Sequence, residues 1–147
     1  GFLVQQNYYK NDVKRVKTKL SNSSVRLSLA EPDITKVDKR RQAQGFPSNY
    51  IHSLDAAHCH MSLVEASKHG LKNFCVIHDC YGSPASELQR FIECVKQSFF
   101  NIYRNNNLDN LYHQTTKQLS DSSKLPTALD MGDFDIEDVL TAPYIFT

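Results

Sequence analysis

The chain has 147 residues, and 40% of them are apolar. This is enough for one domain with a buried core, and it excludes a chain that is disordered throughout. No apolar run approaches the ~20 residues of a membrane-spanning helix, so the sequence predicts no membrane partner. The net charge is only +1, which excludes a uniformly basic or acidic protein.

The cysteines indicate a reducing compartment. Cys59, Cys75, Cys80 and Cys94 lie within apolar or helical patterns instead of a loop-rich framework. The sequence contains no Cys-x-x-Cys pair, so a structural zinc site has little support. We expect buried free thiols.

The chain begins at Gly1, without a methionine, in an apolar stretch. From this we expect that residues precede it, and that the chain is a fragment, a processed product or one piece of a split protein. Residues 1–9 are predicted to form a strand.

Positive charge is concentrated in the first third of the chain. Basic residues outnumber acidic ones by ten to four between Lys10 and Arg41, and the balance turns acidic from Asp109. A basic segment on a nearly neutral chain favours an anionic partner, usually nucleic acid. The alternative is a basic face that is only solvated.

The same segment has the pattern of a β-hairpin. Residues 12–20 fit a helix or a strand equally well, residues 21–24 form a polar turn, and residues 25–29 alternate as a half-buried strand. The exposed face of this hairpin would carry Lys17, Lys19 and Arg26. We expect it to end at residues 31–33, before a polar connector over residues 34–49.

A helix is predicted from Ser53, a capping residue, to Gly70, a left-handed C-terminal cap. Before it, Pro47 should keep the preceding residue extended. Asp55 would lie in the first turn, where an acid stabilises the helix dipole. His58 and His60 do not share a helix face, so we interpret them as core or surface histidines.

Residues 73–82 are the stretch around which we organise the functional argument. Their apolar run, bounded by Asn and Gly, predicts a strand buried on both faces. Asp79 would lie at its exposed end, where a carboxylate needs a cation, so it is a candidate metal ligand. The alternative is a turn aspartate that accepts hydrogen bonds from backbone N–H groups. A Cys80–His78 nucleophile pair is a further possibility, without a visible orienting group.

The rest of the chain is predicted to be mostly helical. Ser83 and Pro84 should cap an amphipathic helix with apolar positions from Leu88 to Tyr103. A further helix over 108–119, a short acidic helix over 134–140 and a docked apolar tail over 144–147 follow.

Two motifs and both chain ends resemble one family. Residues 47–58 (Pro-Ser-Asn-Tyr-Ile-His-Ser-Leu-Asp-Ala-Ala-His) and 76–82 (Val-Ile-His-Asp-Cys-Tyr-Gly) are similar to the C-terminal palm and fingers of single-subunit DNA-directed RNA polymerases. This family includes phage-type, mitochondrial and mitochondrial-plasmid enzymes. Residues 1–6 resemble the strand entering its promoter-reading hairpin, and residues 132–136 with the tail resemble its C-terminal foot.

The resemblance implies a fold and a division into domains. We expect an α+β fold with helices packed on a small antiparallel palm sheet, a basic β-hairpin near the N-terminus and a C-terminal foot. The hairpin and connector would occupy residues 1–45, the palm and fingers segment with the catalytic strand 46–130, and the foot 131–147.

The resemblance also implies nucleotidyl transfer with two Mg²⁺ ions bridged by two aspartates, of which Asp79 matches the second. His78 would stand beside this carboxylate, and His52 would face the hybrid of template and transcript.

By the same resemblance, the hairpin from about Tyr8 to Val37 would match the loop that reads promoter DNA in the major groove, in those family members that read promoters without help. Lys17, Lys19 and Arg26 are singled out on their chemistry alone, as phosphate or base-edge contacts.

The family's first metal-binding aspartate, its triphosphate-binding lysine and its sugar-checking tyrosine lie upstream and have no counterpart here. We therefore predict that the chain alone is inactive, and that activity needs the upstream polymerase part or a partner chain. The implied partners are DNA template and promoter, RNA transcript and NTPs.

Two rival interpretations remain open: a family A DNA polymerase palm, and a catalytically inert scaffold or nucleic-acid-binding subunit derived from a polymerase. For location we expect the mitochondrion, with a viral or plasmid-encoded protein as the alternative.

Overall fold

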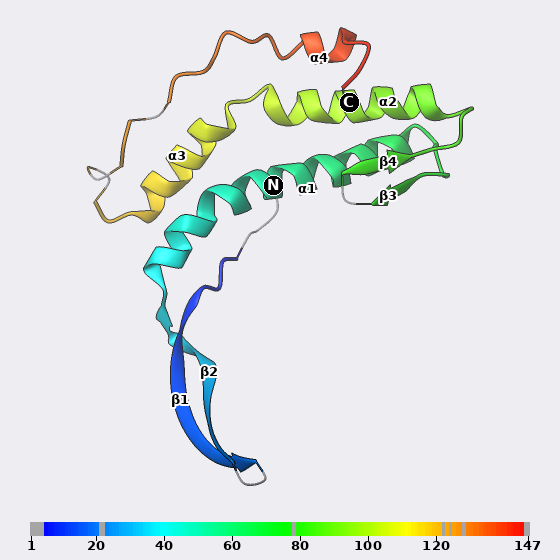
Figure 1. Ribbon diagram of the computed structural model, residues 1–147. Helices are drawn as coiled ribbons and strands as arrows, with labels where there is room; N and C mark the ends of the chain where they lie inside the picture. Colours follow the sequence, from blue (N-terminus) through cyan, green and yellow to red (C-terminus); the bar gives the residue numbers. More distant parts are fainter. Residues whose placement is uncertain are drawn as a thin grey trace. The chain divides into compact units, whose positions relative to one another are not determined.

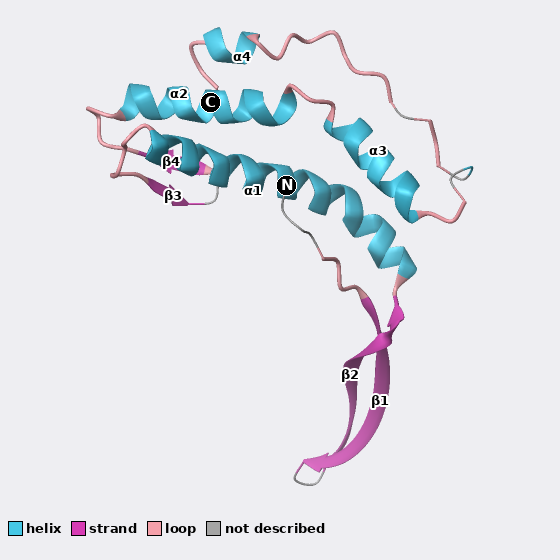
Figure 2. Cartoon of the chain, turned by 180° about the vertical axis from the view of Figure 1, so that it is seen from behind, coloured by secondary structure: helices cyan, strands magenta, loops and turns pink. Residues whose placement is uncertain are grey.

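The computed structural model describes residues 5–20, 23–77, 79–121, 123, 125–127 and 129–145. Within this part of the chain, two antiparallel two-stranded sheets and four helices make a mixed α and β fold (Figures 1 and 2). This confirms the predicted fold class. The chain divides into two compact units, Gly1–Ser53 and Leu54–Thr147, which are described separately.

The first unit contains the predicted basic hairpin. Strands β1 (Tyr9–Leu20) and β2 (Ser23–Val37) pair antiparallel, with Lys17 opposite Arg26. Residues 12–20, which fitted a helix or a strand equally well, are therefore a strand, as their alternating β-branched residues favour. The hairpin does not end at residues 31–33, as the residue pattern predicted, but continues to Val37, as the family resemblance implied. Pro32 is tolerated in a two-stranded sheet, where its missing N–H can face the free edge.

The strand predicted for residues 1–9 is wrong for residues 5–8, which have no regular structure, while residues 1–4 lie outside the described part. Tyr8 instead joins the hairpin to the following helix. Its carbonyl accepts a 2.8 Å hydrogen bond from the N–H of Asp38, and its hydroxyl accepts one of 3.1 Å from Asn49. The ring lies so close to Gly45 that a Cβ there would meet it at 2.9 Å.

Helix α1 (Lys39–Lys68) is much longer than predicted. It replaces the polar connector that was expected up to residue 49. The extended backbone expected before Pro47 is wrong, because Pro47 lies inside the helix. The start signal is Asp38, whose carboxylate accepts a 3.1 Å hydrogen bond from the N–H of Arg41. The predicted end is correct: Gly70 has φ 77°.

The second unit has its core where α1 meets α2 (Leu88–Tyr103). The buried cluster consists of Ala66, Leu71, Phe91, Cys94 and Val95. The amphipathic pattern predicted α2 well, but its N-cap is Glu87, which makes no side-chain capping bond, so the predicted cap at Ser83 is wrong.

The remaining helices follow the predicted order. Helix α3 (Asn107–Gln118) is capped by Asn106, whose side chain accepts hydrogen bonds from the N–H groups of residues 108 and 109. Helix α4 (Asp138–Thr141) is followed by Ile145, which packs against the core cluster. Lys96, itself buried on α2, donates a hydrogen bond to the carbonyl of Ala142. No helix among the described residues is long and apolar enough to cross a membrane.

Candidate functional site

Asp79 lies at the tip of a short hairpin. Strands β3 (Cys75–Ile77) and β4 (Cys80–Gly82) pair antiparallel, with Ile77 opposite Cys80, and Asp79 directly precedes β4. The single doubly buried strand predicted here is wrong, because the chain reverses at Asp79 and Ile77 is 69% exposed. The carboxylate is nevertheless presented at a strand end and is exposed.

A cavity of about 610 Å³ opens beside this tip. Asp79 and Asp55 both line it, so two carboxylates from different elements face one space. Most of the other lining residues are apolar: Tyr81, Leu88, Phe91, Ile92, Val95 and Ile145. Asp79 therefore lies at a cleft that it shares with another acid. An aspartate that serves only a turn could be remote from both.

Asp55 is the residue that the sequence interpretation missed. The helix-dipole explanation is wrong because α1 begins at Lys39, and no acid lies in its first turn. Asp55 instead belongs to a polar stripe at helical spacing that continues through His58, Cys59 and Ser62. Polar residues at this spacing, on a helix that is otherwise expected to bury apolar residues, are the signal in the sequence that points to Asp55.

Aromatic packing holds the hairpin that carries Asp79. The Tyr81 ring lies 6.1 Å from the ring of His58 and 6.0 Å from that of Phe91, centre to centre. Phe91 in turn stacks on Phe74 at 5.7 Å. His58 is buried and its Nε2 lies 3.0 Å from the carbonyl oxygen of Val95, which confirms its interpretation as a core histidine. His60 is exposed, as the surface alternative requires.

Burial raises the pKa of Tyr81 from 10.0 to about 12. The folded protein therefore keeps this phenol protonated at a pH where the unfolded chain has lost the proton. The stability that this difference contributes is fully present below about pH 10 and is lost as the pH rises toward 12.

We therefore expect the free energy of unfolding to fall between about pH 10 and pH 12, and to fall less steeply in Tyr81→Phe. Urea titrations of both proteins across this range would measure the difference. Parallel pH curves for the two proteins would contradict the expectation.

The structure places the other predicted residues as follows. His52 is exposed on α1, and Lys17, Lys19 and Arg26 are exposed on the β1–β2 hairpin. Lys17 and Arg26 form a directly opposed pair, and Lys19 follows two residues along the same face. His78 lies outside the described residues.

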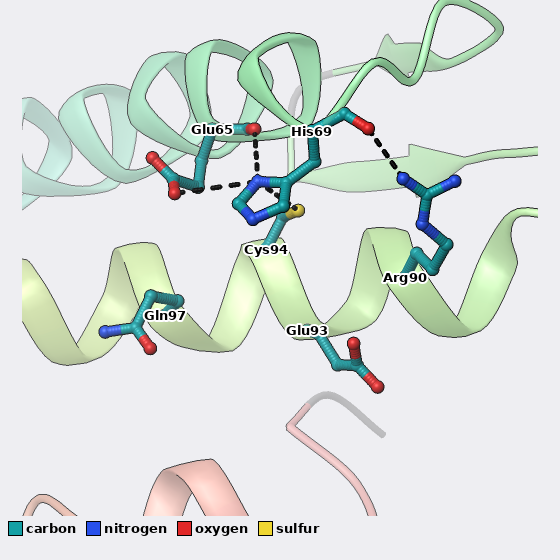
Figure 3. A pocket seen from close by; sticks show the side chains of 6 residues that line it. All are labelled: Glu65, His69, Arg90, Glu93, Cys94 and Gln97. Carbon is teal, nitrogen blue, oxygen red and sulfur yellow. Dashed lines mark hydrogen bonds and ion pairs between the residues drawn. The ribbon is translucent and has the colours of Figure 1, made fainter.

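A second, smaller cavity of about 170 Å³ lies between the end of α1 and α2 (Figure 3). Nδ1 of His69 lies 3.7 Å from the carboxylate of Glu65 and 3.8 Å from Sγ of Cys94, and Arg90 donates a 2.6 Å hydrogen bond to the carbonyl of His69. Burial raises the pKa of the Cys94 thiol. A protonated thiol is a poor nucleophile and metal ligand, so Cys94 is not a candidate for a reactive group in this cavity.

The four cysteines are free, but only part of the burial prediction is right. Cys94 is buried, whereas Cys75 and Cys80 are exposed on the short β3–β4 hairpin. Among the described residues, no group of three or more His, Cys, Asp or Glu side chains is placed to hold a metal ion. Asp79 and Asp55 thus offer carboxylate oxygens of the kind Mg²⁺ prefers, but not a complete site.

Helices surround a small hairpin, and this hairpin presents an aspartate at a cavity. These are the features that the resemblance to single-subunit polymerases implied. A family model described as "DNA-dependent RNA polymerase" matches residues 1–130. The chain therefore belongs to the DNA-dependent RNA polymerase family, of the phage-type, single-subunit kind. This decides against the DNA polymerase palm.

The similarity to several DNA-directed RNA polymerases covers nearly the whole chain. It is 31% identical over 146 residues to "DNA-directed RNA polymerase 1A" of Nicotiana tabacum, covering 99% of this chain and 90% of that protein. It is 31% identical to "DNA-directed RNA polymerase 1, mitochondrial" of Nicotiana sylvestris, with 99% of this chain and 14% of that protein covered. It is 28% identical to the "DNA-directed RNA polymerase" of Enterobacteria phage K11, with 99% and 17% covered.

These relatives differ greatly in how much of them the chain represents. It spans most of the tobacco 1A protein but only 14% of the mitochondrial and 17% of the phage protein. The relatives include mitochondrial, chloroplastic and phage polymerases. Phage-type RNA polymerases generally use Mg²⁺.

Proposed function

We propose that this chain is the C-terminal catalytic part of a DNA-directed RNA polymerase, and that Asp79 supplies one of its two metal-binding aspartates. The observation that carries the proposal is the position of Asp79, at the tip of β3–β4 and on the wall of a 610 Å³ cavity. The family match over residues 1–130 supports it independently.

When bound, Mg²⁺ would lower the pKa of the attacking 3′-hydroxyl and stabilise the leaving pyrophosphate. The contribution of this chain is to hold Asp79 in place. The Tyr81 and Phe91 rings fix the β3–β4 hairpin against α1 and α2, so that the carboxylate needs little reorganisation when a cation arrives. The remaining ligands would come from outside these residues, and His78 would stand beside the carboxylate.

The nucleic-acid contacts would come from the first unit. Lys17, Lys19 and Arg26 share one exposed face of the β1–β2 hairpin, and like charges on adjacent strands are favourable only opposite an anion. We propose that this face binds promoter DNA. By family resemblance, His52 would face the hybrid of template and transcript.

The purified chain 1–147 is expected to show no template-dependent incorporation of NTPs, because its described residues hold no complete group of ligands for two metal ions. Adding the upstream part of the same polymerase should restore incorporation. Radiolabelled NTP incorporation on a promoter template measures both arms, with the upstream part alone as the control. Incorporation by the chain alone that Asp79→Ala abolishes would contradict this prediction.

A catalytically inert scaffold or nucleic-acid-binding subunit is the second candidate. The observation in its favour is that the described residues contain no complete group of metal ligands. If the assembled polymerase keeps its activity with Asp79→Asn, this role is correct and the catalytic one is wrong. For location we propose the mitochondrion, which several relatives support, with a phage-like or plasmid-encoded protein as the alternative.

A further inference from the structure

The β1–β2 hairpin has two chemically different faces. In the paired register, one face carries four basic residues: Arg15, Lys17, Lys19 and Arg26. Within residues 11–19 and 24–32, no acidic residue lies on this face. The opposite face carries an apolar group that we call the apolar face. It consists of Val16, Val25, Leu27 and Leu29.

The side chains of the apolar face are exposed. Its residues are between 37% (Val25) and 56% (Leu29) exposed, although Val16 and Leu27 are directly opposed and cover each other as far as one sheet layer allows. None of them belongs to the buried core cluster. A two-stranded hairpin is marginally stable in water unless a third element covers its apolar side.

The charges at the base of the apolar face are balanced. Lys14 lies opposite Leu29 in the register, and its ammonium is 3.6 Å from the carboxylate of Glu31, which lies opposite Asp12. This face therefore offers apolar surface flanked by both signs of charge. Such a surface suits protein better than the phosphate backbone of nucleic acid, which favours unbalanced positive charge.

We propose that the apolar face is the surface by which the hairpin docks onto the rest of the polymerase, so that only the basic face is left for DNA. The occupant is an apolar protein surface in the part of the polymerase that these residues do not contain. The chain corresponds to 14% of the mitochondrial and 17% of the phage relative, although to 90% of the tobacco 1A protein. The inference rests on the proposed function, because it requires that the chain works within a larger polymerase.

The test is amide hydrogen exchange of β1 and β2, measured on chain 1–147 alone and on the assembled polymerase, both without DNA. Docking should slow exchange in the hairpin by about tenfold or more in the assembly, because strand opening would then have to undock the apolar face. The variant Leu27→Ser/Leu29→Ser should return exchange to the rate of the chain alone.

The matched control is Lys17→Gln/Arg26→Gln, which changes the opposite face of the same two strands. This variant should keep the slowed exchange without DNA but lose promoter binding. Circular dichroism of each variant reports whether α1 and α2 remain folded. If the serine variant is misfolded, the wild-type comparison between chain and assembly still decides the question.

Several outcomes would overturn the proposal. They are equal exchange in chain and assembly, slowing that appears only when DNA is added, slowing in the chain alone that depends on its concentration, and the absence of any larger assembly. The third would mean that a second copy covers the apolar face. The proposed function is tested separately by transcription: slowed exchange in an assembly that does not transcribe keeps the docking surface and rejects catalysis.

Discussion

Asp79→Asn in the assembled polymerase is expected to lower the rate of nucleotide incorporation by at least about a hundredfold, because the loss of a metal-binding carboxylate removes several kcal/mol of transition-state stabilisation. The amide keeps the size of the side chain but lacks the negative charge that a cation needs. Asp79 is exposed, so the substitution should change stability by no more than about 0.5 kcal/mol. Single-turnover incorporation at saturating NTP and Mg²⁺ measures the effect.

Asp55→Asn is the informative control, because this carboxylate lines the same cavity. If Asp79 alone binds metal, Asp55→Asn should reduce the rate far less than Asp79→Asn does. The ratio of the Asp55→Asn rate to the wild-type rate should then stay the same as the Mg²⁺ concentration is raised. Equal losses in the two variants would mean that both carboxylates act on the metal. Full activity of Asp79→Asn would reject the catalytic role.

The two largest elements differ in how well the sequence predicted them. Helix α2 follows from an apolar repeat that continues to Tyr103 without interruption. Helix α1 does not, because Pro47 and Gly45 both disfavour a helix interior. The structure accommodates them. Gly45 leaves room for the ring of Tyr8, and Asp38 caps the helix start seven residues before this glycine and nine before Pro47. A contact with a residue 37 positions earlier in the chain has no local signature.

The candidate site was predictable only in part. The position of Asp79 next to a strand end followed from the apolar run before it, but that run did not show that the chain turns back at this residue. A helix that begins at Ser53, as the sequence predicts, puts Asp55 in its first turn. Once α1 extends to Lys39, Asp55 lies mid-helix, and only the tertiary packing of α1 against β4 brings it to the cavity of Asp79.

Phe91→Ala is expected to destabilise the chain by about 3–5 kcal/mol, the usual cost of emptying a buried phenylalanine site. Phe91 is only 1% exposed and contacts the rings of both Phe74 and Tyr81. Phe74 directly precedes β3 and Tyr81 lies in β4, so these rings cannot close the space without moving the hairpin that carries Asp79. Urea unfolding followed by circular dichroism measures the loss.

The matched control is Phe134→Ala, which removes the same atoms from a side chain that is 67% exposed and should cost no more than about 0.5 kcal/mol. In the assembled polymerase, Phe91→Ala should also reduce incorporation at temperatures where the chain is still folded, because Tyr81 loses its support and Asp79 is less well held. If Phe91→Ala unfolds at the same urea concentration as Phe134→Ala, the aromatic packing does not hold the site. If it is destabilised but fully active below its unfolding temperature, the packing stabilises the fold without positioning the carboxylate.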